Sequence, residues 1–153
     1  MNTNITKTWI VTINEDEVFS RCTNESLYQA YNRLADNPKG DAIVMQEDDR
    51  VQFKLYFASA IANLNMLLAR RMSSPSVDFC GECGDITFVL DMHDNHDDTV
   101  LPILISHCYD YVVKKVLEQW YRADFGSELA RLEINHCLHY RKNPVRRRIG
   151  PLF

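Results

Sequence analysis

The sequence predicts a mainly α-helical (α+β) fold, with a bundle of about four helices, a small antiparallel β-hairpin or sheet, and an extended C-terminal arm. Apolar residues recur three or four positions apart over most of the chain, which is the period of a helix with one buried face. The period changes to two around residues 8–13 and 77–92, as in strands. The last thirteen residues contain two prolines and a glycine, so they cannot form a continuous helix.

The length of 153 residues is near the usual size of one domain. We therefore expect a single helical domain over residues 1–140, with a β-hairpin at about 77–92, followed by a basic arm over residues 141–153. No apolar run approaches the ~20 residues of a membrane span, and the N-terminus lacks a signal pattern. We expect a soluble protein that is made in a cytoplasm and has no membrane partner.

The longest continuous helical pattern runs from Asp97 to Arg122. Asp98 and Thr99, like Asp97, can cap the free N–H groups at its start, and Pro102 fits in the first turn, where no amide donor is needed. One side of this helix is an apolar stripe made of Val100, Leu101, Leu104, Cys108, Tyr111, Val112, Val116 and Trp120. The pattern indicates a helix in the core of the protein.

A strand and a helix are predicted at the N-terminus. Thr8 to Ile13 is β-branched and aromatic with alternating apolar residues, as in a short strand. Asn14 offers an N-cap for a helix through about Asn32, which Thr23 and Asn24 could split in two. Its predicted apolar face is Val18, Cys22, Ser26, Leu27, Ala30, Tyr31 and Leu34. Residues 36–40 form a turn by composition.

The second helix is predicted from Gln46 to about Met72, with an acidic start. One side carries Val51, Leu55, Ala58, Ile61, Ala62, Asn65 and Leu68, and the apolar surface is widened by Phe53, Phe57, Leu64 and Leu67. This helix is apolar around much of its circumference, so we expect it to be central in the protein or shared between two partners.

A hairpin and a last helix complete the pattern. Val77 and Phe79 alternate before the glycine-containing tip at residues 80–85, and Ile86, Phe88 and Leu90 alternate after it. The N-terminal strand can add to this hairpin and make a small sheet.

The last helix is expected to be capped by Ser127 and to extend to about Tyr140. A thinner apolar face of Leu129, Leu132, His136 and Leu138 indicates a peripheral helix.

The net charge of −4 is unevenly distributed. Residues 1–100 hold 8 Lys and Arg against 16 Asp and Glu, whereas residues 101–153 hold 9 against 5. Such segregation suits head-to-tail packing between copies, or an acidic body whose basic arm binds an acidic partner. Ordinary solvated faces with one charged terminus are the alternative interpretation. The five cysteines lack framework spacing, and we expect most of them to be reduced thiols.

Cysteines and histidines suggest a zinc site that their spacing argues against. Cys80 and Cys83, followed by His93 and His96, have the residue types of a tetrahedral set. The residues between the two pairs are mostly the second hairpin strand, which places the pairs roughly 25 Å apart at ~3.3 Å per residue. The CxxC also lies between strands, whereas a redox CxxC begins a helix.

The remaining catalytic and ligand patterns are incomplete. An EF-hand counted from Asp91 would need Gly at position 96 and a carboxylate at 102, where the chain has His96 and Pro102, so a helix-capping turn is favoured. Glu133 and His136 form one Glu-x-x-His where di-iron bundles need two. Nucleophile elbows and phosphate loops are missing. We expect no enzyme activity, no bound metal and no cofactor.

The C-terminal arm carries the candidate site residues, which are Arg141, Lys142, Arg146, Arg147, Arg148, Ile149, Leu152 and Phe153. A charged terminus broken by proline is most often disordered. The apolar residues favour a different interpretation, in which they anchor in a groove on another subunit while the arginines pair with carboxylates. The arm also suggests phosphate contacts, although it lacks the aromatic residues interleaved with basic ones that single-strand binders have, and the body is acidic.

The order of predicted elements resembles a family of virion proteins. Together with LEQWY at Leu117–Tyr121 and KNPVRRRIGPLF at Lys142–Phe153, it resembles the head-to-tail connector (neck) proteins of tailed phages, closest to those of Bacteroidales-infecting, crAss-like phages. The resemblance is strongest over Leu101–Phe153. It implies a structural protein of the virion neck, made in the host bacterial cytoplasm.

The resemblance also implies partners. They are further copies of the chain in a homo-oligomeric ring of about twelve, the portal protein, other neck or tail proteins, and DNA contacted non-specifically in the channel. Residues 141–153 would form the contact with a neighbouring subunit or with the portal. The alternative function is a small zinc-binding or nucleic-acid-binding regulator that uses Cys80 and Cys83 or Arg146–Arg148.

Overall fold

The computed structural model describes residues 5–33, 44–72, 78–79 and 84–141. Along the chain lie β1 (Ile5–Asn14), α1 (Glu15–Arg33), the short 3-10 helix η2 (Glu47–Asp49), α2 (Arg50–Leu68), η3 (Ala69–Arg71), β2 (Asp78–Phe79), β3 (Asp85–His93), η4 (Asp98–Val100), α3 (Leu101–Tyr121) and α4 (Ser127–His139). The described residues therefore form four α-helices and an antiparallel sheet, which confirms the predicted mainly α fold.

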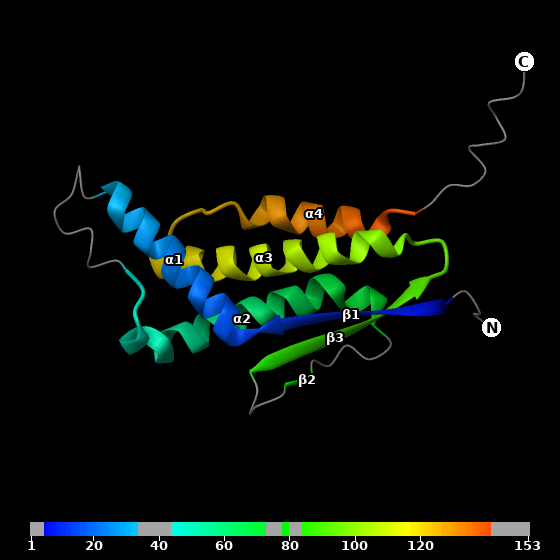
Figure 1. The fold of residues 1–153 in the computed structure, drawn as a ribbon, viewed down its shortest axis with the longest axis horizontal. Coiled ribbons are helices and arrows are strands. Elements are labelled where there is room, and N and C mark those ends of the chain that lie inside the picture. The colour runs from blue at the N-terminus through cyan, green and yellow to red at the C-terminus, as the bar shows by residue number, and fades with distance from the viewer. Residues whose placement is uncertain (1–4, 34–43, 73–77, 80–83, 142–153) are drawn as a thin grey trace, which may run out of the picture.

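Helix α3 lies at the centre of the structure. It packs against α1, α2, α4 and β1, and Figure 1 shows α2, α3 and α4 side by side with α3 in the middle. The predicted stripe is buried at Leu104, Cys108, Tyr111, Val112 and Val116. Pro102 lies in the first turn and Asp97 accepts a hydrogen bond from the Thr99 amide, both as predicted.

The sheet has the strand order β1–β3–β2, with both pairs antiparallel. The N-terminal strand thus adds to the hairpin, as expected, although β1 is longer than predicted and only two residues of β2 are described. Trp9 lies opposite Leu90, Val11 opposite Phe88, and Ile13 opposite Ile86. These six side chains are buried, which confirms the predicted alternation and gives the sheet one face in the core.

Helix α1 is continuous, so the predicted helix is confirmed and Thr23 and Asn24 do not split it. Its start agrees with the prediction, because Asn14 Oδ1 accepts a hydrogen bond from the Glu17 amide at 2.9 Å. Val18, Cys22 and Ala30 are buried as expected, whereas Leu27 and Tyr31 are exposed. Buried Ser26 has a structural role instead, since its hydroxyl accepts a hydrogen bond from the Met45 amide where the chain approaches η2.

The predicted face of α2 is only partly correct, because Ile61 and Leu68 alone of its apolar residues are buried as expected. The buried residues are Phe53, Phe57, Ala60, Ile61, Leu64 and Leu68, whereas Val51, Leu55, Ala58 and Ala62 are exposed. Both sides of this helix have the apolar period, so the period alone cannot choose between them. The larger phenylalanine side gains more from burial and faces α3 and β3.

The start and face of α4 also differ from the prediction. Ser127 is the first helical residue, and the cap comes from Glu118 at the end of α3. The Glu118 carboxylate accepts hydrogen bonds from the Phe125 amide, the Ser127 amide and the Ser127 hydroxyl. Ala130, Ile134, Cys137 and Leu138 are buried, whereas Leu129, Leu132 and His136 are exposed. A carboxylate from another helix thus replaces the predicted local cap.

Three predicted features lie wholly or mostly outside the described residues. They are the turn at 36–40, the hairpin tip at 80–85 and the C-terminal arm beyond Arg141. The buried side chains of the described helices and strands form one hydrophobic core.

Replacement of Leu64 by Ala tests the face assignment of α2. The free energy of unfolding should fall by about 2–5 kcal/mol, because a fully buried side chain leaves a cavity. Leu55→Ala on the exposed face should change it by less than about 0.5 kcal/mol. Urea denaturation at low protein concentration measures both, and a larger loss for Leu55→Ala than for Leu64→Ala would mean that α2 is turned the other way.

Replacement of Glu118 by Ala tests the joint between α3 and α4. It removes the acceptor of three hydrogen bonds and should lower the free energy of unfolding by about 1–3 kcal/mol. Glu133→Ala, an exposed carboxylate on α4, is the matched control. A loss no larger than the control's, measured by the same denaturation, would refute the capping role.

Candidate interaction surfaces

Carboxylates gather where α1 and α2 begin. Glu15, Asp16 and Glu17 occupy the first turn of α1, and Glu47, Asp48 and Asp49 form η2 directly before α2. This placement is local chemistry, because negative charge is favourable at helix N-termini. The two starts are joined by Arg50, whose guanidinium lies 2.6 Å from Asp16 and 3.7 Å from Glu47.

This acidic cluster keeps a net negative charge. Besides Arg50, Lys54 lies 3.8 Å from Glu15 and Arg21 lies 2.8 Å from Glu17. Six carboxylates thus have three cationic partners among the described residues. Glu47 and Asp48 remain exposed and define what we call the acidic start of α2.

A groove with cationic walls lies at the opposite end of α2. It has a volume of about 440 Å³ and is lined by Met66, Leu67, Arg70, Arg71, Asn135, Leu138 and His139. We call it the basic groove. Arg71 is fixed there by a 2.8 Å hydrogen bond to the carbonyl oxygen of Leu138 near the end of α4. A cation at a helix C-terminus is favoured by the helix dipole.

The basic groove lies where the chain leaves α4. Figure 1 shows that α2 and α4 finish at the same end of the molecule, away from the start of α2. Arg141 follows α4 there and is exposed. Burial and the positive charge of Arg141 lower the pKa of Arg71, which indicates that the two guanidinium groups repel each other.

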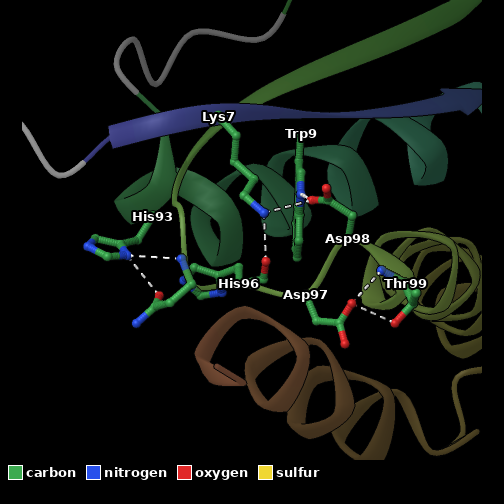
Figure 2. Close-up of polar contacts among 8 residues, drawn as sticks. Lys7, Trp9, His93, His96, Asp97, Asp98 and Thr99 are labelled. Carbon is green, nitrogen blue, oxygen red and sulfur yellow. Dashed lines mark hydrogen bonds and ion pairs between the residues drawn. The ribbon is translucent and has the colours of Figure 1, made fainter. Parts of the chain in front are cut away.

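The turn between β3 and α3 is fastened to β1 at this same end (Figure 2). Lys7 Nζ donates hydrogen bonds to the His96 carbonyl at 2.6 Å and to Asp98 Oδ1 at 3.0 Å. Trp9 Nε1 donates to the same Asp98 oxygen at 3.0 Å. Asp97 caps η4. The carboxylates of Asp97 and Asp98 therefore accept hydrogen bonds within the fold.

His96 is the most unusual side chain of this turn. It is fully buried and packs edge-on against the Trp9 ring. Neither ring nitrogen has a partner with hydrogen-bonding geometry among the described residues. Burial lowers the pKa of His96, and the positive charges of Arg71 and Arg141 lower it further. The Tyr140 backbone raises the pKa, but by less than the other influences lower it. The ring is therefore neutral near pH 7.

Of the predicted site residues, only Arg141 belongs to the described part of the chain. Lys142, Arg146, Arg147, Arg148, Ile149, Leu152 and Phe153 lie outside it. Arg70, Arg71 and the exposed side of α2 were not predicted as a site. The apolar circumference of α2 was the available signal for this surface.

The predicted zinc ligands are only partly described. Cys80 and Cys83 lie outside the described residues, and His93 Nδ1 accepts a hydrogen bond from the Asn95 amide. The hairpin assumed in the distance argument is present, and β3 separates the CxxC from His93. Within the described ranges, no group of three or more metal-ligating side chains occurs.

The other candidate groups are dispersed. Cys22, Cys108 and Cys137 are free and buried, as expected for reduced thiols, and burial raises the pKa of Cys22 to about 12. Glu133 and His136 are exposed on α4, and Glu133 lies 3.8 Å from His107 of α3. These three residues line a shallow groove of about 240 Å³ between the two helices.

The burial of His96 predicts a loss of stability in acid. Because its pKa is lowered below 6.5 in the folded protein, the unfolded chain binds the proton more readily. His96 has no such effect above about pH 6.5, and its penalty grows as the pH falls below that value until the folded form is also protonated. Urea denaturation between about pH 7.5 and about pH 5 should show this decline.

His96→Phe is the variant that assigns this pH dependence, since it fills the site with an apolar ring. It should flatten the decline in unfolding free energy, whereas His136→Gln, at an exposed position on α4, should leave it in place. An undiminished decline in the His96→Phe variant would assign the titration to another group. His93, Arg71, Arg141 and the Tyr140 backbone are the polar neighbours that act on the ring.

None of the helices in the described part of the chain has the length and apolarity that crossing a bilayer requires. No protein-family model, curated protein or solved structure matches the chain.

Proposed function

We propose that the chain is a structural, non-enzymatic virion protein that forms a homo-oligomeric ring in a phage neck, joining the portal at the capsid vertex to the tail. The observation that carries this proposal is the separation of charge along α2. Its acidic start and the basic groove lie at opposite ends of a 19-residue helix, about 28 Å apart at 1.5 Å per residue.

Opposite charges at two ends favour head-to-tail contact between copies. Such a contact joins two different surfaces, so each subunit can bind one neighbour at each end. A head-to-tail series closes into a ring when the rotation between subunits is suitable, and otherwise grows as a filament. A neck ring needs two different faces, because one face contacts the portal and the other contacts the tail.

The basic arm is suited to reach a neighbouring chain. Its first residue, Arg141, follows α4, and the positive charge of Arg141 lowers the pKa of Arg71, which is a repulsion between like charges. The arm has five Lys and Arg residues, and the acidic cluster of a neighbour would attract them. Ile149, Leu152 and Phe153 add apolar contacts that exposed ion pairs alone lack, since such pairs contribute only about 0–1 kcal/mol each.

Contact with the portal and with channel DNA follows from the same chemistry. Arg141, Lys142 and Arg146–Arg148 can bind carboxylates of the portal or of another neck protein. The same side chains can contact DNA phosphates without reading sequence. The net negative body would repel DNA, which suits a channel through which a genome passes.

Removal of residues 142–153 tests the proposal. The full chain should form rings with a mass of about twelve subunits by light scattering, and the truncated chain should be monomeric, because the arm supplies the contact with the next subunit. The truncation leaves Arg141 and α4 in place, and circular dichroism checks that the helices are intact.

The controls separate the proposal from the alternatives. A full-length variant with Arg146, Arg147 and Arg148 replaced by Ser should assemble more weakly, with less dependence on salt. A full-length chain that stays monomeric at all concentrations, or a ring that is indifferent to the truncation, would contradict the proposal. Stoichiometric zinc lost in Cys80→Ser, or sequence-specific DNA binding, would favour the regulator instead.

A further inference from the structure

An apolar row follows the solvent side of α2. Val51, Leu55 and Met66 are 77%, 62% and 74% exposed, and Ala58 and Ala62 lie between them at helical spacing. Scattered exposed apolar residues are common on protein surfaces, but a continuous row on one helix face is typical of a contact surface. No described segment of the chain covers this row.

The two ends of the row differ in charge and shape. At its beginning, Glu47 and Asp48 protrude beside Val51 and Leu55, which makes an acidic and apolar projection. At its end, Met66, Leu67 and Leu138 supply the apolar lining of the basic groove, and Arg70, Arg71 and His139 supply the charge. One end is therefore the chemical complement of the other.

We infer that the start of α2 in one copy of this chain docks into the basic groove of the next copy. This inference rests on the proposed ring and names a second contact between its subunits, in addition to that of the arm. The occupant of the groove is the region from Glu47 to Leu55 of a second copy. Two different surfaces meet, so an open series of subunits retains a free acidic start at one end and a free basic groove at the other until the ring closes.

Both charge complementarity and the burial of apolar surface would contribute to this contact. Glu47 and Asp48 would face Arg70 and Arg71 of the next copy. This pairing fixes the direction of docking, because an acidic start against an acidic start, or a groove against a groove, would place like charges together. Val51 and Leu55 would cover Met66 and the partly exposed Leu67, which removes exposed apolar surface from water. Arg71 is already held by Leu138, so a wall of the groove is formed before the partner arrives.

A charge-swap experiment tests the pairing of the two surfaces. In the full-length chain, E47K/D48K and R70E should each weaken self-association by at least about tenfold, measured by sedimentation and light scattering. An equimolar mixture of the two should regain most of the lost association, since each altered start then meets an altered groove. Loss in both variants without recovery in the mixture would overturn the inference.

Matched controls change charge elsewhere on the surface. D110K/E133K makes the same charge change on α3 and α4, and R122E makes the same change as R70E at the end of α3. Both should assemble like the unaltered chain. Equal weakening by the controls would show that net charge alone governs assembly, which would overturn the docking assignment.

A second pair of variants tests the direction of docking. L55D blocks the acidic start but leaves the groove, whereas M66D blocks the groove but leaves the start, and both positions are exposed. Head-to-tail docking predicts that each variant alone fails to associate. It also predicts that the mixture gives dimers, with one chain of each variant, that do not grow further. In a two-fold pairing of α2 with α2, each dimer would contain two such contacts, and one of them would be blocked in the mixed dimer. The absence of dimers in the mixture would overturn the inference.

The outcomes also separate this contact from the proposed neck function. If removal of residues 142–153 dissolves the ring but the variants on α2 do not affect it, the arm proposal stands and the α2 contact is refuted. If the charge swap behaves as expected but the assemblies are open or dimeric, the α2 contact stands and the neck ring is refuted.

Discussion

Burial of α3 is the constraint on which the rest of the structure depends. A 21-residue helix with buried residues from Leu104 to Leu117 needs apolar partners along most of its length. Helices α1, α2 and α4 and strand β1 provide them. Because α3 occupies the middle, each surrounding element has only one side facing the core and must expose the other.

For α2 this arrangement has a direct consequence. Its phenylalanines, including Phe53 and Phe57, face the core, and its second apolar side is left in solvent. A helix that is apolar all round is normally buried all round, so a chain with this pattern has unused hydrophobic surface. Association with another chain is the physical way to cover it, which links the packing of α3 to the proposed assembly.

The charge distribution follows from helix ends rather than from a dedicated binding motif. Carboxylates at the starts of α1 and α2, and arginines at the end of η3, each stabilise the helix that carries them. Figure 1 shows that α2 runs along the length of the molecule, so the carboxylates before its start and the arginines after its end are far apart. Arg141, which follows α4, adds to the positive charge at the end of η3.

By itself, the sequence determined which elements form. The period of three or four, the caps at Asn14 and Asp97, and the alternation of β3 are local signals that act within one turn or one strand. They located the helices, the sheet and the acidic starts. They could not locate the basic groove, because Arg70, Arg71 and His139 come from segments more than 60 residues apart.

Only the tertiary structure decided which sides of α2 and α4 are buried and what caps α4. Two apolar faces on one helix are equivalent until neighbours of definite shape select one, and Glu118 reaches Ser127 only after α3 and α4 pack together. The burial of His96 against Trp9 likewise depends on the turn after β3 being fastened to β1. Such choices are made by contacts between distant residues, which local propensity does not contain.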